Sequence, residues 1–107
     1  ITLLHVSPQA QHQLPPAGRR AVTAAHDAAF ERAMHGPRRL LQRARVPWKE
    51  VRTKGDPGSQ IADYARRNDC SLIIMGSRGR SGVSGLLLGS VVQKTIAACR
   101  TSVLIVR

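Results

Sequence analysis

The segment Leu72-Ile-Ile-Met-Gly-Ser-Arg-Gly-Arg-Ser-Gly-Val-Ser-Gly-Leu-Leu-Leu-Gly-Ser-Val-Val92 decides how this 107-residue chain is built. Its first four residues form an apolar run rich in branched side chains, which predicts a short strand buried on both faces. The run stops at Gly76, and a glycine-rich segment follows. A second apolar periodicity begins at Gly89 and predicts a helix. Ser90 is the expected N-cap of this helix, with Gln93 completing a capping box.

A strand, a glycine-rich loop and a helix start together form a layout that holds phosphate. Glycines let backbone N–H groups turn toward an anion that a Cβ would otherwise keep away. The first N–H groups of the helix add partial positive charge, and the Ser90 hydroxyl can serve a phosphate oxygen. The loop arginines Arg78 and Arg80 add further positive charge. The segment matches neither Gly-x4-Gly-Lys-Ser/Thr nor Gly-x-Gly-x-x-Gly, and its glycines alone fit a loop without a ligand equally well.

The spacing of the glycines, Gly76-x2-Gly79-x9-Gly89-Ser90, resembles the ATP-binding signature of the universal stress protein (UspA-like) family. Other parts of the chain stand in the order typical of that family. They are the opening Leu-Leu-His-Val, the internal Gly55-Asp-Pro-Gly and the closing Ser-Val-Leu-Ile-Val-Arg. The resemblance therefore covers essentially the whole chain.

The resemblance implies a site for ATP or another adenine nucleotide. Mg²⁺ or Mn²⁺ is expected to bind through the phosphates, because their charge needs neutralising, and the chain offers no obvious carboxylate pair as a metal ligand. The backbone at Val6 would contact adenine, and three glycines would give the nucleotide access to the backbone. Other residues would line the ribose and phosphates or lie next to them. The complete expected site is Val6, Met75, Gly76, Ser77, Arg78, Gly79, Arg80, Ser81, Gly89, Ser90 and Val91.

The rest of the chain predicts alternating strands and helices. The expected strands are 1–6, 46–54, 72–75 and 101–106, and the expected helices are 19–34, 37–44, 57–68 and 90–99. His35-Gly36-Pro37 is expected to interrupt the first helical stretch, and Asp56 to cap the helix that Pro57 opens. This alternation predicts an α/β fold with a layered, open parallel sheet. The resemblance implies that the layers are α/β/α and that the fold is Rossmann-like, similar to that of adenine nucleotide alpha hydrolase-like proteins.

Residues 1–107 are expected to form one domain that lacks the first strand and helix of the resembled family. In that family the first strand lies in the middle of the sheet, between the strands that match 1–6 and 72–75, and it ends in an Asp that contacts the nucleotide. Its absence would leave two unpaired strand edges inside the sheet, which costs backbone hydrogen bonds. We therefore expect a longer polypeptide, or another chain, to supply this unit.

The charge and composition of the chain limit the kinds of molecule that it is expected to bind. The formal net charge is +11, from 17 Lys and Arg against 6 Asp and Glu, which keeps nucleic acid among the possible partners. The basic residues are scattered, however, and aromatic residues make up only 3% of the chain, so no base-stacking surface is predicted and a nucleic-acid role is disfavoured. The sequence holds no apolar run long enough to span a bilayer and no secretory leader. A cytoplasmic protein without a membrane partner is expected.

Three functions remain open on this evidence. The favoured one is an ATP-binding universal stress protein that acts as a stress-response signalling or regulatory module. Little or no catalysis is expected, because no acid or base other than Ser90 and the arginines stands near the loop. The second is a dimeric interaction module without nucleotide, and the third is a basic nucleic-acid-binding protein. The resemblance also implies a homodimer through the last strand, Ser102–Val106, whose apolar edge would suit a symmetric partner.

Overall fold

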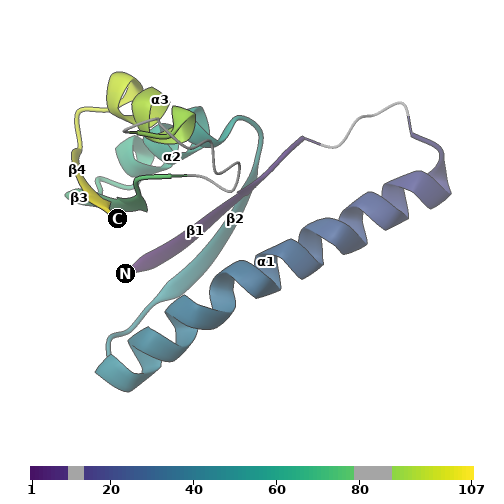
Figure 1. The fold of residues 1–107 in the computed structure, drawn as a ribbon, viewed down its shortest axis with the longest axis horizontal. Coiled ribbons are helices and arrows are strands. Elements are labelled where there is room, and N and C mark those ends of the chain that lie inside the picture. The colour runs from purple at the N-terminus through teal and green to yellow at the C-terminus, as the bar shows by residue number, and fades with distance from the viewer. Residues whose placement is uncertain (10–13, 79–87) are drawn as a thin grey trace. The chain divides into compact units, whose positions relative to one another are not determined.

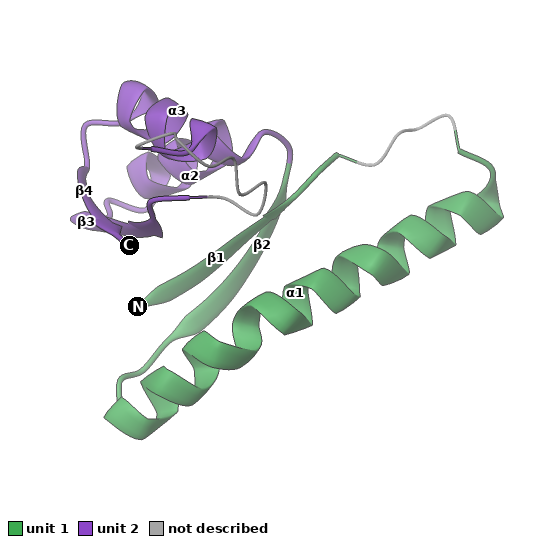
Figure 2. Cartoon of the chain, viewed as in Figure 1, with its two compact units in different colours: residues 1–54 green, residues 55–107 purple. Residues whose placement is uncertain are grey.

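A computed structural model describes residues 1–9, 14–78 and 88–107 of the chain (Figure 1). Strands and helices alternate in the order β1 (Thr2–Ser7), α1 (Pro16–Ala44), β2 (Lys49–Lys54), α2 (Pro57–Arg67), β3 (Leu72–Gly76), α3 (Ser90–Ala98) and β4 (Ser102–Val106). The chain divides into two compact units, Ile1–Lys54 and Gly55–Arg107 (Figure 2). The predicted α/β class is confirmed, and the expected strands agree with the observed ones except that β2 begins at Lys49.

The first unit consists of α1 and the parallel pair β1–β2, in which Thr2 pairs with Lys49 and Ser7 with Lys54. Helix α1 lies along one face of this pair. The Phe30 ring meets the edge of His5 with 5.5 Å between the ring centroids, and the Arg52 guanidinium lies 4.5 Å from the same ring. Phe30 and Met34 are the buried residues of the helix. The interface between helix and strands therefore combines one aromatic ring with several charged groups.

Helix α1 runs without a break through Gly36 and Pro37, so the predicted interruption there is wrong. Proline has no N–H and removes one hydrogen bond from the helix interior. Arg38, the next residue, compensates through two carboxylates. It donates to Glu31 at 2.6 Å, seven residues earlier and on the other side of the proline, and to Glu50 of β2 at 2.6 and 2.7 Å. Arg38 thus links the two halves of the helix across Pro37 and joins the second half to β2.

The second unit consists of α2, α3 and the parallel pair β3–β4, in which Ile74 pairs with Leu104. The predicted start of α2 is confirmed, because the Asp56 carboxylate accepts from the Ser59 amide at 2.9 Å and Pro57 opens the helix. Helices α2 and α3 pack closely at Gly58, where a Cβ would lie 2.7 Å from the Cβ of Lys94. The core is aliphatic and consists of small and branched residues. Its buried members are Ala62, Ala65, Ile73, Val92 and Thr95.

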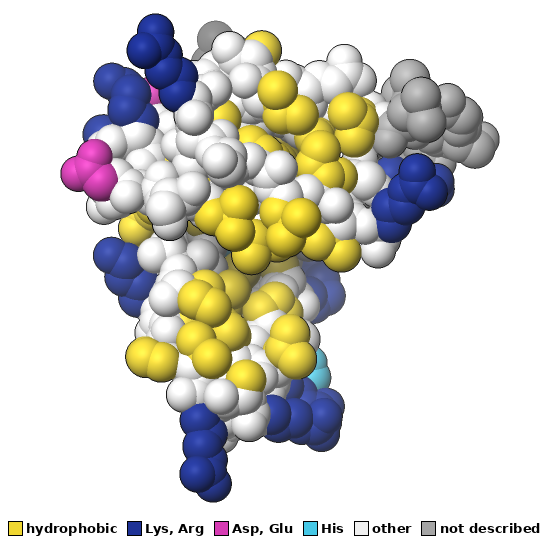
Figure 3. All heavy atoms as spheres, turned by 90° about the vertical axis from the view of Figure 1, so that its left-hand side faces the viewer, with side chains coloured by type: hydrophobic (Ala, Val, Ile, Leu, Met, Phe, Trp, Pro, Cys, Tyr) yellow, Lys and Arg dark blue, Asp and Glu magenta, His cyan; other side chains and the backbone are white. Residues whose placement is uncertain are grey.

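One face of the β3–β4 pair is exposed, so the prediction that β3 is buried on both faces is wrong. Side chains alternate along a strand, and paired residues of parallel strands share a face. Ile73 is buried, whereas Leu72 and Ile74 are 47% and 64% exposed, and Leu104 and Val106 of β4 are each 49% exposed. Figure 3 shows hydrophobic side chains gathered on the side of the molecule to which these strands contribute. We call Leu72, Ile74, Leu104 and Val106 the apolar sheet face.

The four described strands pair two and two, β1 with β2 and β3 with β4, rather than in one continuous sheet. Each pair therefore has two edges that carry no further strand among the described residues. Unpaired strand edges expose backbone N–H and C=O groups to solvent or to another strand. The family resemblance implies a further strand next to the strands that match β1 and β3, and each of these two strands has one edge without a neighbour among the described strands.

Candidate functional site

The carboxyl end of β3 and the start of α3 are tied together by the backbone of Ser77. The Ser77 amide donates to the Val106 carbonyl at 2.8 Å, and the Ser77 carbonyl accepts from the Gly89 amide, also at 2.8 Å. Ser77 itself is buried. Residues that the sequence separates by twelve positions therefore meet at one corner of the second unit. The structure brings Gly76, Ser77, Gly89 and Ser90, all members of the predicted site, together there.

The N-cap of α3 is Gly89 rather than Ser90, so the predicted capping box is wrong. Gly89 has an extended backbone (φ −66°, ψ 157°), and its carbonyl accepts the first helical bond from the Gln93 amide at 3.1 Å. Ser90 is consequently the first residue inside the helix. The Gln93 side chain reaches back to the Leu88 carbonyl at 2.8 Å instead of to a capping hydroxyl. Because glycine has no side chain, no cap hydrogen bond covers the start of this helix.

The uncapped start of α3 leaves its first amides available to an anion. The N–H groups of Ser90, Val91 and Val92 have no acceptor within the helix, as is general for the first turn of any helix. The first turn contains no acidic residue, so nothing there competes with an incoming negative charge. The helix dipole adds partial positive charge at this end. The Gly89 amide does not contribute, since it is already bonded to Ser77.

Gly76, Met75 and Arg78 are the members of the predicted site that lie in β3 or just after it. Among the described residues, a Cβ at Gly76 would meet the carbonyl oxygens of Arg78 and Val106, at 3.7 and 4.0 Å, which are ordinary contacts. The described residues therefore leave room for a side chain at this position. Met75 is half-buried, and Arg78 is exposed.

One residue of the predicted site lies in the other unit, and three lie outside the described residues. Val6 is half-buried in β1 and belongs to the first unit, whereas the rest of the predicted site belongs to the second. The predicted members Gly79, Arg80 and Ser81 lie outside the described residues. The described part of the predicted site is therefore the part at the end of β3 and the start of α3.

Two further searches of the described residues bear on function. No group of three or more His, Cys, Asp or Glu side chains that could hold a metal ion occurs among residues 1–9, 14–78 and 88–107. Within the same residues, no helix has the length and hydrophobicity needed to cross a membrane.

Sequence reasoning missed a hollow in the first unit, lined by Arg19, Arg20, Thr23 and Asp27 of α1. In the sequence these side chains look like an ordinary solvated helix face. The spacing Arg19, Thr23, Asp27 places side chains on one side of a helix, and this was the only signal that could have grouped them.

The structure defines an α/β protein with parallel strands, and comparison with solved structures supports the same class. The universal stress protein UspA from Lactobacillus plantarum superimposes with a TM-score of 0.80 and 23% identity, over 99% of this chain and 76% of that one. The hypothetical protein MJ0577 superimposes with a TM-score of 0.73 and 24% identity, over 98% of this chain and 73% of that one. At this level of identity the likeness concerns the fold alone.

The model of the universal stress protein family matches residues 1–107, and the chain belongs to that family. The universal stress protein YxiE of Bacillus subtilis is 39% identical over 62 residues, which are 58% of this chain and 42% of that protein. A universal stress protein of Methanothermobacter thermautotrophicus is 32% identical over 78 residues, 73% of this chain and 50% of that protein. The matched stretches thus span half or less of these curated relatives.

Proposed function

We propose that this chain is the nucleotide-binding part of a universal stress protein and that it holds ATP or another adenine nucleotide. The observation that supports this proposal is the start of α3, where three backbone amides after the glycine N-cap have no hydrogen-bond acceptor among the described residues. Parallel α/β proteins bind ligands outside the carboxyl ends of their strands, and phosphates suit helix starts of this kind. Mg²⁺ or Mn²⁺ would accompany the nucleotide, bound through its phosphates.

In this proposal each residue has a limited role. The amides of Ser90 and Val91 donate to phosphate oxygens, the Ser90 hydroxyl adds a donor, and Gly76 lets the nucleotide approach the strand end without a Cβ. Arg78 adds exposed positive charge, and Gly79, Arg80 and Ser81 extend the loop signature. Met75 and the backbone at Val6 would contact the ribose and adenine. Little or no hydrolysis is expected, since the first turn of α3 supplies no acid or base to orient water. The bound state would then act as a stress-response signal in the cytoplasm.

A change of charge at Ser90 tests the proposal without disturbing the fold. An aspartate in the first turn interacts favourably with the helix dipole, so Ser90→Asp should keep or slightly raise the melting temperature. The same carboxylate would repel phosphates, and ATP affinity measured by titration calorimetry should fall by roughly tenfold or more. Ser71→Asp is the matched control, because Ser71 is exposed and precedes β3 at its opposite end. Equal ATP binding by the unaltered chain and both variants would contradict the proposal.

We also propose that two copies of the chain pair through β4. Strand β4 bonds to β3 on one side only among the described strands, and Leu104 and Val106 are half exposed. An apolar strand with a free edge favours a symmetric partner. Leu104→Lys should convert a dimer into a monomer in analytical ultracentrifugation, whereas Leu40→Lys, which changes a more exposed leucine on α1, should not. A monomeric unaltered chain, or a dimer that survives Leu104→Lys, would contradict pairing through this strand.

A further inference from the structure

We propose that the outer face of α1 is a docking surface for double-stranded DNA, which it holds through the phosphate groups. The surface consists of three exposed arginines in the second half of the helix, Arg32, Arg39 and Arg43, and we call them the arginine face. It belongs to the first unit alone. The inference therefore does not depend on nucleotide binding at the start of α3.

The arginine face lies opposite the buried side of α1. Arg39 follows Arg32 by seven residues, and Arg43 follows Arg39 by four. At about 3.6 residues per turn, these intervals bring all three to one side of a helix. Phe30 and Met34 are the buried residues of α1, and the same periodicity places them on the other side. The arginine face therefore points away from the strands that α1 covers.

This alignment depends on the unbroken course of α1. An interruption at residues 35–37, as the sequence predicts, would place Arg32 and Arg39 on separate helices with different directions. Because α1 continues through Gly36 and Pro37, basic residues that look scattered in the sequence form one surface in the fold. Gly36 lies on the same side of the helix, and no described atom lies within 4 Å of the position that a Cβ would take there. The described residues leave the helix open between the arginines.

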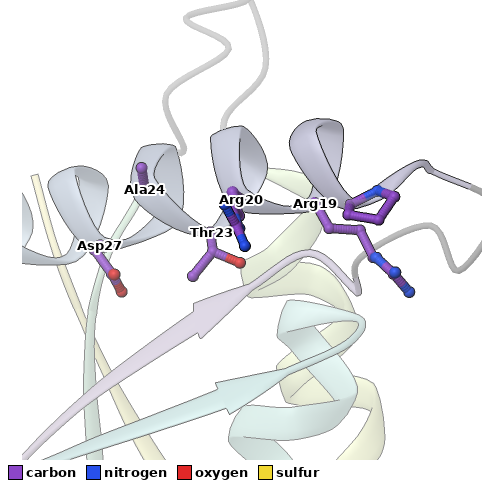
Figure 4. A pocket seen from close by; sticks show the side chains of 6 residues that line it. Arg19, Arg20, Thr23, Ala24 and Asp27 are labelled. Carbon is purple, nitrogen blue, oxygen red and sulfur yellow. The ribbon is translucent and has the colours of Figure 1, made fainter.

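The charges of the arginine face are not neutralised by the described residues. Both acidic residues of α1 are paired with other arginines, Asp27 with Arg52 at 2.7 Å and Glu31 with Arg38 at 2.6 Å. Figure 4 shows Asp27 on the side of α1 nearer β1. The arginine face itself has no ion pair with any described residue. Like charges on neighbouring turns of a helix repel one another, so a bound anion would relieve this repulsion.

The chemistry of the arginine face favours nucleic acid over a protein or a membrane. Protein interfaces have an apolar or aromatic centre, and helices that lie on membranes carry an apolar side. In α1, all of whose residues are described, Leu40 is the one exposed large apolar residue, which is too little for either. Interfaces with DNA depend instead on arginine and lysine contacts to phosphate oxygens.

The dimensions of the arginine face suit a DNA duplex. Arg32 and Arg43 are eleven residues apart, or about 17 Å along a helix, and a duplex carries about ten phosphate charges over that length. An α-helix is about 10–12 Å across with its side chains, and the major groove of DNA is about 12 Å wide. The major groove of an RNA duplex is deep and narrow. The geometry thus points to DNA, with the arginines on phosphates that border the groove.

The test is the binding of a labelled DNA duplex of about 16 base pairs, followed by fluorescence anisotropy at several salt concentrations. Near physiological salt the dissociation constant should be about 10⁻⁶–10⁻⁴ M, as for other contacts to phosphate alone. Three contacts predict a slope of about −2.7 when the logarithm of the association constant is plotted against that of the salt concentration. Arg39→Gln/Arg43→Gln should weaken binding about tenfold or more and bring the slope to about −0.9.

Two double variants serve as controls. Arg66→Gln/Arg67→Gln removes the same charge from exposed positions of α2 and should leave the affinity within about twofold and the slope unchanged. Arg39→Lys/Arg43→Lys keeps the charge of the arginine face and should keep the slope, because lysine binds phosphate as a point charge. Circular dichroism melting curves check that every variant remains folded.

Ser90→Asp separates this inference from the proposed nucleotide site, because it should bind DNA as the unaltered chain does. Four results would each overturn the inference. They are no binding of the duplex at about 50 mM salt, equal losses in the two glutamine double variants, binding of an RNA duplex as tight as that of DNA, and binding of polyglutamate as tight as that of DNA.

Discussion

The two units hold helices against parallel strands in different ways. In the first unit the contact between α1 and the strands depends on charged groups: Arg38 joins Glu31 and Glu50, and Arg52 pairs with Asp27 over the Phe30 ring. In the second unit it depends on small and aliphatic side chains, with Thr95 fully buried and its hydroxyl bonded to the Val91 carbonyl at 2.8 Å. Charged contacts respond to pH and salt, whereas close packing responds to volume.

This difference explains which kinds of substitution should destabilise each unit. A charged interface tolerates a change of side-chain size but loses strength when one partner is neutralised. An aliphatic interface is insensitive to pH but cannot accommodate added atoms, because protein interiors are packed as densely as organic crystals. The three predictions below test this difference, beginning with the largest expected effect.

Adding one methyl group should have opposite effects in the two units. Gly58→Ala places a Cβ 2.7 Å from the Cβ of Lys94, and forcing α2 and α3 apart should lower the free energy of unfolding by about 2 kcal/mol. Gly18→Ala makes the same change near the start of α1, where the nearest atom lies at 3.6 Å. It should raise stability by roughly 0.5–1 kcal/mol through helix propensity. Urea unfolding measures both, and equal effects of the two changes would contradict the packing difference.

Acid should weaken the first unit before the second. Hydrogen bonds from Arg38 hold the pKa values of Glu31 and Glu50 below their ordinary value of 4.5. Because the folded pKa values are lowered, these carboxylates contribute stability above pH 4.5 that is lost as the pH falls through the lowered values. Amide exchange in α1 should therefore accelerate below about pH 4.5 while exchange in α3 stays slow.

Arg38→Gln is the variant that sharpens this expectation. It removes the cause of both lowered pKa values, so α1 should become less stable at neutral pH and lose most of its dependence on pH between neutrality and acid. Arg43→Gln, which removes an exposed charge from the same helix, serves as the control. If amide exchange in α1 of Arg38→Gln accelerates in acid as it does in the unaltered chain, groups other than Glu31 and Glu50 cause the pH dependence.

The smallest effect is expected at the start of α2. Two interactions hold the pKa of the Asp56 carboxyl below its ordinary value. The hydrogen bond from the Ser59 amide contributes most, and the Lys94 ammonium, 3.0 Å from the carboxylate, adds to it. Asp56→Asn keeps a capping oxygen and loses the charge, whereas Asp56→Ala loses both. The melting temperature should fall by roughly 3 °C for alanine and by less for asparagine. An equal loss in the two variants would assign the effect to the ion pair with Lys94 alone.

The site could be predicted from the sequence only in part. The spacing of Gly76, Gly89 and Ser90 identified the segment that the backbone of Ser77 closes on itself. The capping residue was wrong by one position, because serine and glycine both occur at helix starts and only the hydrogen bond from Gln93 to Gly89 distinguishes them. The hollow lined by Arg19, Arg20, Thr23 and Asp27 had no sequence signal of comparable strength, since in the sequence these side chains look like an ordinary solvated helix face.

The sequence by itself determined the order of strands and helices, the family and the cap at Asp56. These features depend on neighbouring residues, through the apolar periodicities and the hydrogen bond from Ser59, and so they can be read locally. The tertiary structure alone decided that α1 continues through Pro37, that the strands pair two and two, and that one face of β3–β4 is exposed. Each of these depends on contacts between residues far apart in the chain, such as that of Arg38 with Glu50, which local patterns do not encode.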